Sequence, residues 1–155
     1  MPQHAFASML LATLLGVAGP ASAGAQSAQD RLWDAAIAGD TAAVIQAIAD
    51  GADVNALDTR TNPNGRRALN WAAWYNHVSV IEVLLAHGAQ IDAVNDTGFS
   101  ALHHAAEAGS PDAARALLAR GADPSLTNFA GRGPIETARA RGHTELVEIL
   151  SAAGR

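Results

Sequence analysis

The sequence predicts an all-α solenoid in which about four helix-turn-helix repeats stack in a row. Two observations support this fold class. The first is that glycines recur 33 residues apart, as in Gly98 and Gly131, Gly109 and Gly142, and Gly121 and Gly154. The second is that segments with apolar residues at helical spacing lie between these glycines. A fixed period of this size is typical of proteins in which each repeat packs only against its neighbours.

The third repeat carries the most complete motif. It reads Gly-x-Ser-Ala-Leu-His-x-Ala-Ala-x-x-Gly over residues 98–109 and Leu-Leu-x-x-Gly-Ala-Asp over residues 117–123. This pattern resembles the ankyrin repeat, with its Gly-x-Thr-Pro-Leu-His-x-Ala-Ala core and its Leu-Leu-x-x-Gly-Ala-Asp close. The resemblance covers residues 30–155. It implies an ankyrin-repeat solenoid with short β-turn fingers, and a family that binds proteins and is rarely catalytic.

The N-terminal segment has a different composition from the rest of the chain. Residues 6–17 are almost wholly apolar, Pro20 follows them, and residues 21–23 read Ala-Ser-Ala. An apolar core, a breaker and a small-x-small site are typical of a secretory signal peptide. We therefore expect a signal peptide over 1–23, cleaved after Ala23 or Ala25, with an uncleaved anchor or a buried helix as the alternatives. Residues 24–29 are expected to form a flexible leader.

The remaining chain divides into expected repeats over 30–55, 56–92, 93–125 and 126–155. In the first of these, Gly39 is expected to end one helix and Asp40 to cap the next. In the third, Ser110 is expected to cap the second helix, with proline at its first position. The last repeat has a more polar second helix, as a terminal repeat needs for solubility.

The second repeat departs from the period. The stretch before its first helix is four residues longer than its counterpart in the third repeat, and residues 61–65 are rich in turn formers. Insertions in repeat proteins often lie on the binding face. The alternative is a tolerated loop without a function. Asn76 stands where the other repeats have glycine, and asparagine tolerates the left-handed backbone expected there.

The histidine pair His103-His104 is the strongest candidate for chemistry. Neighbouring helix residues do not share a face, so one metal ion does not readily bind both. We expect His103 to form a hydrogen bond within its finger–helix joint and His104 to lie at the concave edge. The chain has no phosphate-binding glycine loop, zinc spacing or nucleophile elbow. The sequence therefore predicts a protein that is not an enzyme, with no catalytic residues, metal site or cofactor.

The candidate binding residues are those that the repeat pattern leaves free. In the ankyrin resemblance, finger residues and the residues before each helix-ending glycine or asparagine line one concave surface. The expected partner-binding residues are Arg66, Trp74, Tyr75, Asp96, Phe99, Glu107, Phe129 and Arg132. Their four aromatic side chains are expected to form an exposed row suited to a protein partner. The alternative is that Trp74 and Tyr75 only cover the long loop of their own repeat.

Composition limits the class of partner. The net charge is −5 and no basic stripe is present, which argues against nucleic acid. The chain has no cysteine, so it has no disulfide framework. We expect a monomer that binds another protein and has no stable membrane insertion after signal cleavage.

These observations predict a non-catalytic protein–protein interaction module in the bacterial periplasm, with secretion as the alternative location. The chain resembles small exported ankyrin proteins of bacteria, which suggests a stress-defence enzyme as one class of partner. The alternative function is an immunity or inhibitor protein against an exported enzyme or toxin, because an acidic chain suits a basic target.

Overall fold

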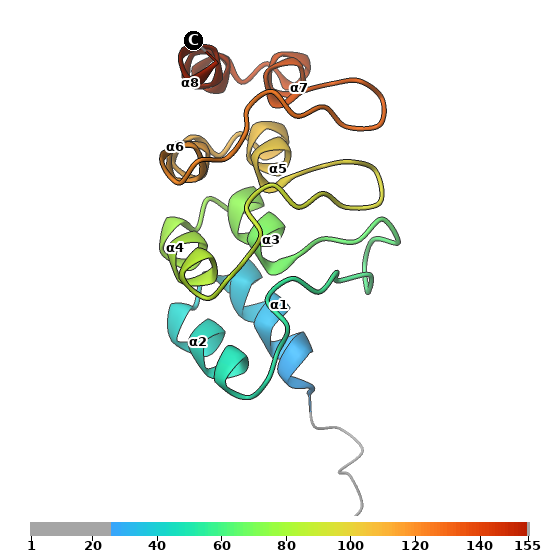
Figure 1. The fold of residues 1–155 in the computed structure, drawn as a ribbon, viewed down its shortest axis with the longest axis vertical. Coiled ribbons are helices and arrows are strands. Elements are labelled where there is room, and N and C mark those ends of the chain that lie inside the picture. The colour runs from blue at the N-terminus through green and yellow to red at the C-terminus, as the bar shows by residue number, and fades with distance from the viewer. Residues whose placement is uncertain (1–25, 155) are drawn as a thin grey trace, which may run out of the picture.

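A computed structural model describes residues 26–154 of the chain, and this part contains eight α-helices. Figure 1 shows four stacked helix pairs, with α1, α3, α5 and α7 in an inner layer beside the fingers and α2, α4, α6 and α8 in an outer layer. The described residues form no strand, only an isolated bridge between Asp58 and Arg66. The predicted all-α repeat solenoid is confirmed. The helices are α1 (Ala28–Ala38), α2 (Thr41–Ala49), α3 (Ala68–Trp74), α4 (Val78–Ala86), α5 (Ala101–Ala108), α6 (Pro111–Ala119), α7 (Pro134–Arg141) and α8 (Thr144–Ala153).

The first helix of each pair ends at a residue with left-handed backbone. Gly39, Gly109 and Gly142 adopt φ values of 76°, 79° and 77° after α1, α5 and α7. Asn76 takes this place after α3 with φ 60°, as its position in the sequence predicted. Asp40 caps α2 by accepting the N–H of Ala43 at 3.0 Å.

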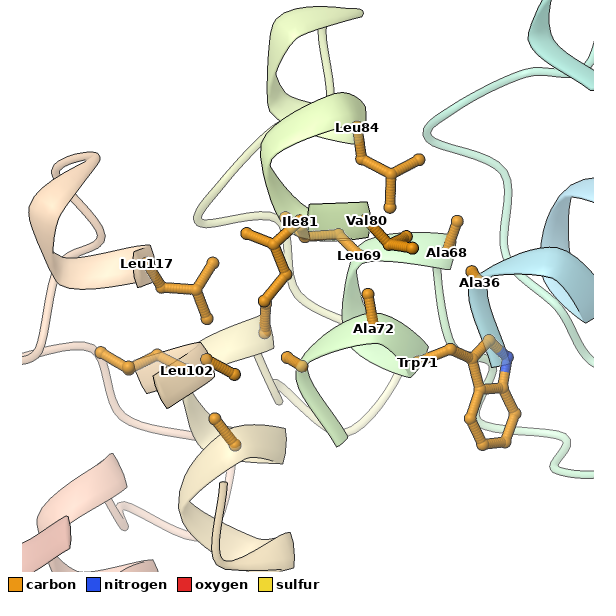
Figure 2. Close-up of a cluster of buried hydrophobic side chains, with 14 of the residues drawn as sticks. Ala36, Ala68, Leu69, Trp71, Ala72, Val80, Ile81, Leu84, Leu102 and Leu117 are labelled. Atoms are coloured by element: carbon orange, nitrogen blue, oxygen red, sulfur yellow. The ribbon is translucent and has the colours of Figure 1, made fainter. Parts of the chain in front are cut away.

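The core lies between the two helix layers and between neighbouring pairs. Figure 2 shows leucine, isoleucine and valine side chains from α3, α4, α5 and α6 meeting in this space. Small residues are fully buried where inner helices approach one another, including Ala36, Ala72 and Ala105, each at 0% exposure. A larger side chain at these sites would overpack the contact between neighbouring helices.

Hydrogen bonds also join successive repeats at the start of each outer helix. Nε2 of His77 donates to the carbonyl of Ile37 at 2.9 Å, and Nε2 of His143 donates to the carbonyl of Glu107 at 3.2 Å. The Ser110 hydroxyl donates to the Trp74 carbonyl at 2.9 Å, at the equivalent position. Ser110 is the N-cap residue of α6 and Pro111 follows it, as expected, but the Ser110 side chain forms no capping bond because its hydroxyl binds the preceding repeat.

Three fingers connect the helix pairs: the long finger (56–67), the middle finger (93–100) and the last finger (126–133). Each has a buried polar residue at its base, namely Asp58, Asn95 or Asn128. The N–H of this residue donates to the carbonyl of Arg66, Phe99 or Arg132, respectively, at 2.8–3.0 Å. The middle finger stacks on the long one, since the Asn95 amide donates to the Gly65 carbonyl at 3.1 Å.

The long finger is also attached to the first repeat. The Arg60 guanidinium lies 2.9 Å from Asp34, 3.3 Å from Asp30 and 2.9 Å from the buried Asp58. Its carbon Cζ lies 4.9 Å from the centre of the Trp33 ring. The inserted residues therefore lie in a loop that is held at its base by ion pairs to α1.

The expected signal peptide over 1–23 lies outside the described residues. The helix α1 begins at Ala28, so the last two residues of the expected leader, Ala28 and Gln29, are helical. The Gln29 side chain exchanges two hydrogen bonds with the backbone of Asp53, at 2.8 and 3.1 Å. Among the helices of residues 26–154, none is long and apolar enough to cross a membrane.

Candidate partner-binding surface

The concave face is the surface formed by the three fingers and the finger-facing sides of the inner helices. Its residues recur every 33 positions from Arg66 onward. The four extra residues of the long finger come before Arg66 and therefore do not disturb this spacing. Three sets of equivalent positions define it: Arg66, Phe99 and Arg132 at the finger ends, Trp71, His104 and Thr137 one turn into the helices, and Trp74, Glu107 and Ala140 one turn further on.

Arg66 is held flat against two tryptophans of α3. Its guanidinium carbon lies 4.5 Å from the ring centre of Trp71 and 4.3 Å from that of Trp74. Burial lowers the pKa of Arg66, while the nearby Glu107 and Tyr75 oppose this shift. Arginine keeps its charge in such surroundings, since its guanidinium is not deprotonated in proteins. The stacking fixes a cation at the end of the long finger.

His104 lies behind this arginine and is 3% exposed. Its ring contacts Trp74 edge-on, with centroids 6.1 Å apart, and lies 5.6 Å from the ring of Phe99. Neither ring nitrogen has a hydrogen-bond partner among the described residues. Burial, together with the Arg66 charge, lowers the pKa of His104 to about 3. His104 lies on the concave face, as expected, but its side chain is buried against Trp74 and Phe99.

Three hollows follow one another along this face. The Arg66 cavity measures about 280 Å³ and lies between the long finger, the middle finger and α5, where Arg66, Phe99, His104 and Glu107 line it. A second hollow of about 260 Å³ shares Phe99 and Glu107 and adds Arg132 and Arg141. A third, of about 330 Å³, lies between the tips of the middle and last fingers and includes Asp96 and Phe129. Six of the eight expected binding residues line these hollows, whereas Trp74 and Tyr75 line none of the three.

The expected aromatic residues differ in exposure. Tyr75 is 47% exposed and Phe129 is 76% exposed, so both side chains are accessible to a partner. Trp74 and Phe99 are only partly exposed, because Arg66 covers the first and His104 packs against both. The expected row of four exposed aromatics is therefore wrong for Trp74 and Phe99. The alternative for Trp74, that it packs with its own long finger, fits the contact with Arg66.

Charge on the concave face is opposite in sign to that of the whole chain, which is −5. Glu107 of α5 forms a salt bridge with Arg141 of α7, the next inner helix, and this neutralises the pair. Among the described residues, neither Arg66 nor Arg132 forms a salt bridge. Asp96 is exposed near the tip of the middle finger. The hollows between the finger bases therefore carry a local positive charge.

Comparisons with known proteins agree with this architecture. The family model "Ankyrin repeats (3 copies)" matches residues 32–128, which is more than half of the chain. The chain belongs to the ankyrin-repeat family. It is 37% identical over 81 residues to "Ankyrin repeat domain-containing protein SAT10" of Stachybotrys chartarum, covering 52% of this chain and 4% of that protein. It is 37% identical over 67 residues to "B-cell lymphoma 3 protein homolog" of Mus musculus, covering 43% of this chain and 14% of that protein. The chain thus matches only a small part of these relatives.

Ankyrin repeats are generally non-catalytic modules for protein–protein interaction. In this ankyrin-repeat chain the Ser100–His103 pair has a structural use. The Ser100 hydroxyl donates to His103 Nδ1 at 2.9 Å, and Nε2 donates to the Arg132 carbonyl in the next finger at 3.1 Å. Burial lowers the pKa of His103, which favours the neutral ring that makes both bonds. Asn70 and Glu136 take the equivalent position in the neighbouring repeats and accept the N–H of Arg67 and Gly133 at 2.7 and 3.0 Å.

Three features of the ankyrin-repeat surface were missed by sequence reasoning. Arg60 ties the long finger to α1 through Asp34 and Asp30, which lie 26 and 30 positions earlier, and no local pattern indicates that contact. Arg141 of the last repeat neutralises Glu107 of the third repeat. His104 occupies the position of the buried Trp71 in the preceding repeat. The 33-residue register could have identified this last site, since it aligns His104 with Trp71 of the preceding repeat.

Proposed function

We propose that this ankyrin-repeat chain is a non-catalytic module that binds a partner protein through its concave face. One observation carries this proposal: the concave side of the stack holds aromatic and arginine side chains that stay accessible although Tyr75 also stacks on Trp71 and His77. Tyr75 and Phe129 are exposed, and Arg132 is exposed without an ion pair among residues 26–154. Aromatic residues and arginine are enriched at protein interfaces and dominate binding energy.

We place the protein in the bacterial periplasm, as a monomer, with secretion as the alternative. The apolar segment 6–17 and the Ala-Ser-Ala triplet that follows support export, and the absence of cysteine is compatible with it. The resemblance to small exported ankyrin proteins of bacteria makes a stress-defence enzyme one candidate partner.

An immunity or inhibitor protein remains the second candidate function. Its original support was the net charge of −5, which suits a basic target. The concave face carries the opposite local charge through Arg66 and Arg132, so the charge argument does not favour a basic target for that face.

A pull-down from the periplasmic extract of the source organism tests the proposal. The bait is the wild-type protein, and parallel baits carry Tyr75→Ala with Phe129→Ala on the concave face, or Ile45→Ala on the outer helix α2. Ile45 is 47% exposed, like Tyr75, and therefore controls for the loss of an exposed apolar side chain. We expect a partner that is lost only with the concave variant. A stress-defence or housekeeping enzyme would support the first function, and a toxin encoded nearby would support the second. Recovery of the same partner by all three baits would contradict binding through the concave face.

A further inference from the structure

The Arg66 cavity contains a fixed cation that the described part of the chain leaves without a counter-ion. The guanidinium carbon lies over the rings of Trp71 and Trp74, 4.5 and 4.3 Å from their centres. Within residues 26–154 the Arg66 guanidinium forms no salt bridge, and its Nε is buried without a hydrogen-bond partner. Arginine presents its N–H groups as a planar fork that matches a carboxylate with two parallel hydrogen bonds. Because the stacking holds this fork in place, a ligand would not have to order it.

The surroundings of the cation also suit an anionic group. Amide and hydroxyl side chains of Asn62, Asn64 and Thr97 line the same cavity of about 280 Å³. Glu107 is the acidic side chain among its lining residues, and the salt bridge to Arg141 offsets that charge. His104 lines the cavity too, 3% exposed and with both ring nitrogens unpartnered among the described residues. The Thr97 hydroxyl already donates to Asn95 Oδ1 at 2.9 Å and the His104 nitrogens are buried, so the lining combines one unpaired cation with the Asn62 and Asn64 amide groups.

We infer that the Arg66 cavity receives an acidic side chain, aspartate or glutamate, from the partner protein, with its carboxylate bound by the Arg66 guanidinium. This inference rests on the proposed function and adds the chemistry of the partner segment. The neighbouring hollow, which shares Phe99 with the Arg66 cavity, is lined by Arg132. A second carboxylate on the same partner segment would meet this second cation. The partner segment is accordingly acidic, in contrast to the basic target that the net charge of the chain suggests.

A hexaglutamate peptide, acetylated and amidated at its ends, is the probe for this site. Binding is followed by the tryptophan fluorescence of the purified protein and by the NMR signals of the Trp71 and Trp74 indole N–H groups, which report on the stacked arginine. Arg66→Gln removes the cation, Arg66→Lys keeps the charge without the fork, and Arg139→Gln is the matched control. Arg139 is exposed on α7 and lines a different hollow, together with Val147 and Glu148.

We expect Arg66→Gln to weaken hexaglutamate binding at least about tenfold, and Arg66→Lys to weaken it nearly as much, because an ammonium lacks the planar fork. Arg139→Gln should leave binding within about twofold, since screened charges at a distance contribute little. Equal losses in Arg66→Gln and Arg139→Gln would show non-specific attraction and overturn the inference. Equal binding of hexaglutamine would overturn it as well. Inorganic phosphate that binds as tightly as the peptide would assign the site to a free anion and reject the partner side chain.

Two further measurements keep the test decisive. If Arg66→Gln fails to fold by circular dichroism, the indole signals of the wild-type protein decide alone, and their failure to shift with hexaglutamate overturns the inference. A captured partner that depends on Tyr75 and Phe129 but binds Arg66→Gln normally would remove this inference and leave the proposed function intact. A captured partner that ignores all three residues would remove the proposed function.

Discussion

The imidazole of His77 lies against the Cα of Gly39 in the preceding repeat, and its Nε2 donates to the carbonyl of Ile37 at 2.9 Å. A Cβ added at Gly39 would lie 2.7 Å from Nδ1 of His77. Gly109 has the same relationship with His143. Between α3 and α6 the position holds Asn76, and there a smaller residue, Ser110, reaches the equivalent carbonyl. At each junction a small residue thus faces a larger one: glycine faces histidine of the next repeat, and the larger Asn76 faces the smaller Ser110.

This packing predicts different costs for two glycine substitutions. Gly39→Ala should lose about 1–2 kcal/mol from left-handed backbone strain at φ 76° and more from displacement of His77. Gly142→Ala has nearly the same φ, 77°, but its Cβ would meet nothing within 4 Å, so it should show only the strain. Urea unfolding of both variants measures the difference. Equal losses would show that the histidine contact is unimportant for stability.

Arg60 should stabilise the long finger through its contact with the buried Asp58. Burial raises the pKa of Asp58, but the hydrogen bonds and charge of Arg60 outweigh this and hold it below its usual value. Arg60→Gln leaves that carboxylate, 1% exposed, with fewer partners and should cost about 1–3 kcal/mol in urea unfolding.

The matched control for this prediction comes from the other fingers, which have Asn95 and Asn128 where the long finger has Asp58. The double variant Asp58→Asn with Arg60→Gln should therefore recover part of the lost stability. A double variant that is less stable than Arg60→Gln alone would contradict this explanation.

His104 should make the protein less stable in mild acid. Its pKa is about 3 in the folded chain and about 6.5 when unfolded, so the unfolded chain binds the proton first. The free energy of unfolding should fall as the pH drops below about 6.5, by at most about 1.4 kcal/mol per pH unit from this group. Above that pH the contribution is complete, and near pH 3 the loss levels off.

His104→Phe fills a similar volume between Trp74 and Phe99 without the unpartnered nitrogens. It should raise stability by about 1–3 kcal/mol and flatten the pH dependence above pH 4. His87→Gln removes an exposed imidazole at the end of α4 and is the control. Unfolding curves from pH 4 to 7 provide the comparison. If wild type and His104→Phe lose stability equally with acid, His104 is not the group responsible.

Export should leave a shortened chain. We expect mass spectrometry of the protein from a periplasmic fraction to find its N-terminus at Gly24, or at Gln26 if cleavage follows Ala25. Both alternative N-termini precede Ala28, the first residue of α1, so cleavage would leave the folded repeats intact. An intact Met1 terminus on cytosolic protein would reject the signal peptide.

Sequence reasoning recovered the features that depend on local pattern. The period of 33 residues located the helix pairs, and the helix-ending glycines and Asn76 marked the left-handed positions. It also identified which positions form the concave face, because those follow from the register. It did not predict which of them are accessible. Arg66 covers Trp74, and His104 packs between Trp74 and Phe99, through contacts across finger and helix that no local spacing encodes.

This difference changes which residues test the binding surface. Truncating Trp74 or Phe99 would disturb the cluster around His104, so a loss of binding could follow from a loss of packing. Tyr75 and Phe129 are better choices, because their side chains are 47% and 76% exposed.

The most direct measurement is the affinity of a captured partner for the Tyr75→Ala, Phe129→Ala double variant, determined by calorimetry beside Ile45→Ala. We predict that the concave variant loses at least about thirtyfold in affinity, corresponding to about 2 kcal/mol, while its urea midpoint stays close to that of the wild type. Ile45→Ala should bind normally. Unchanged affinity in the concave variant, together with a loss in Ile45→Ala, would place the contact on the outer helices and contradict the concave binding surface.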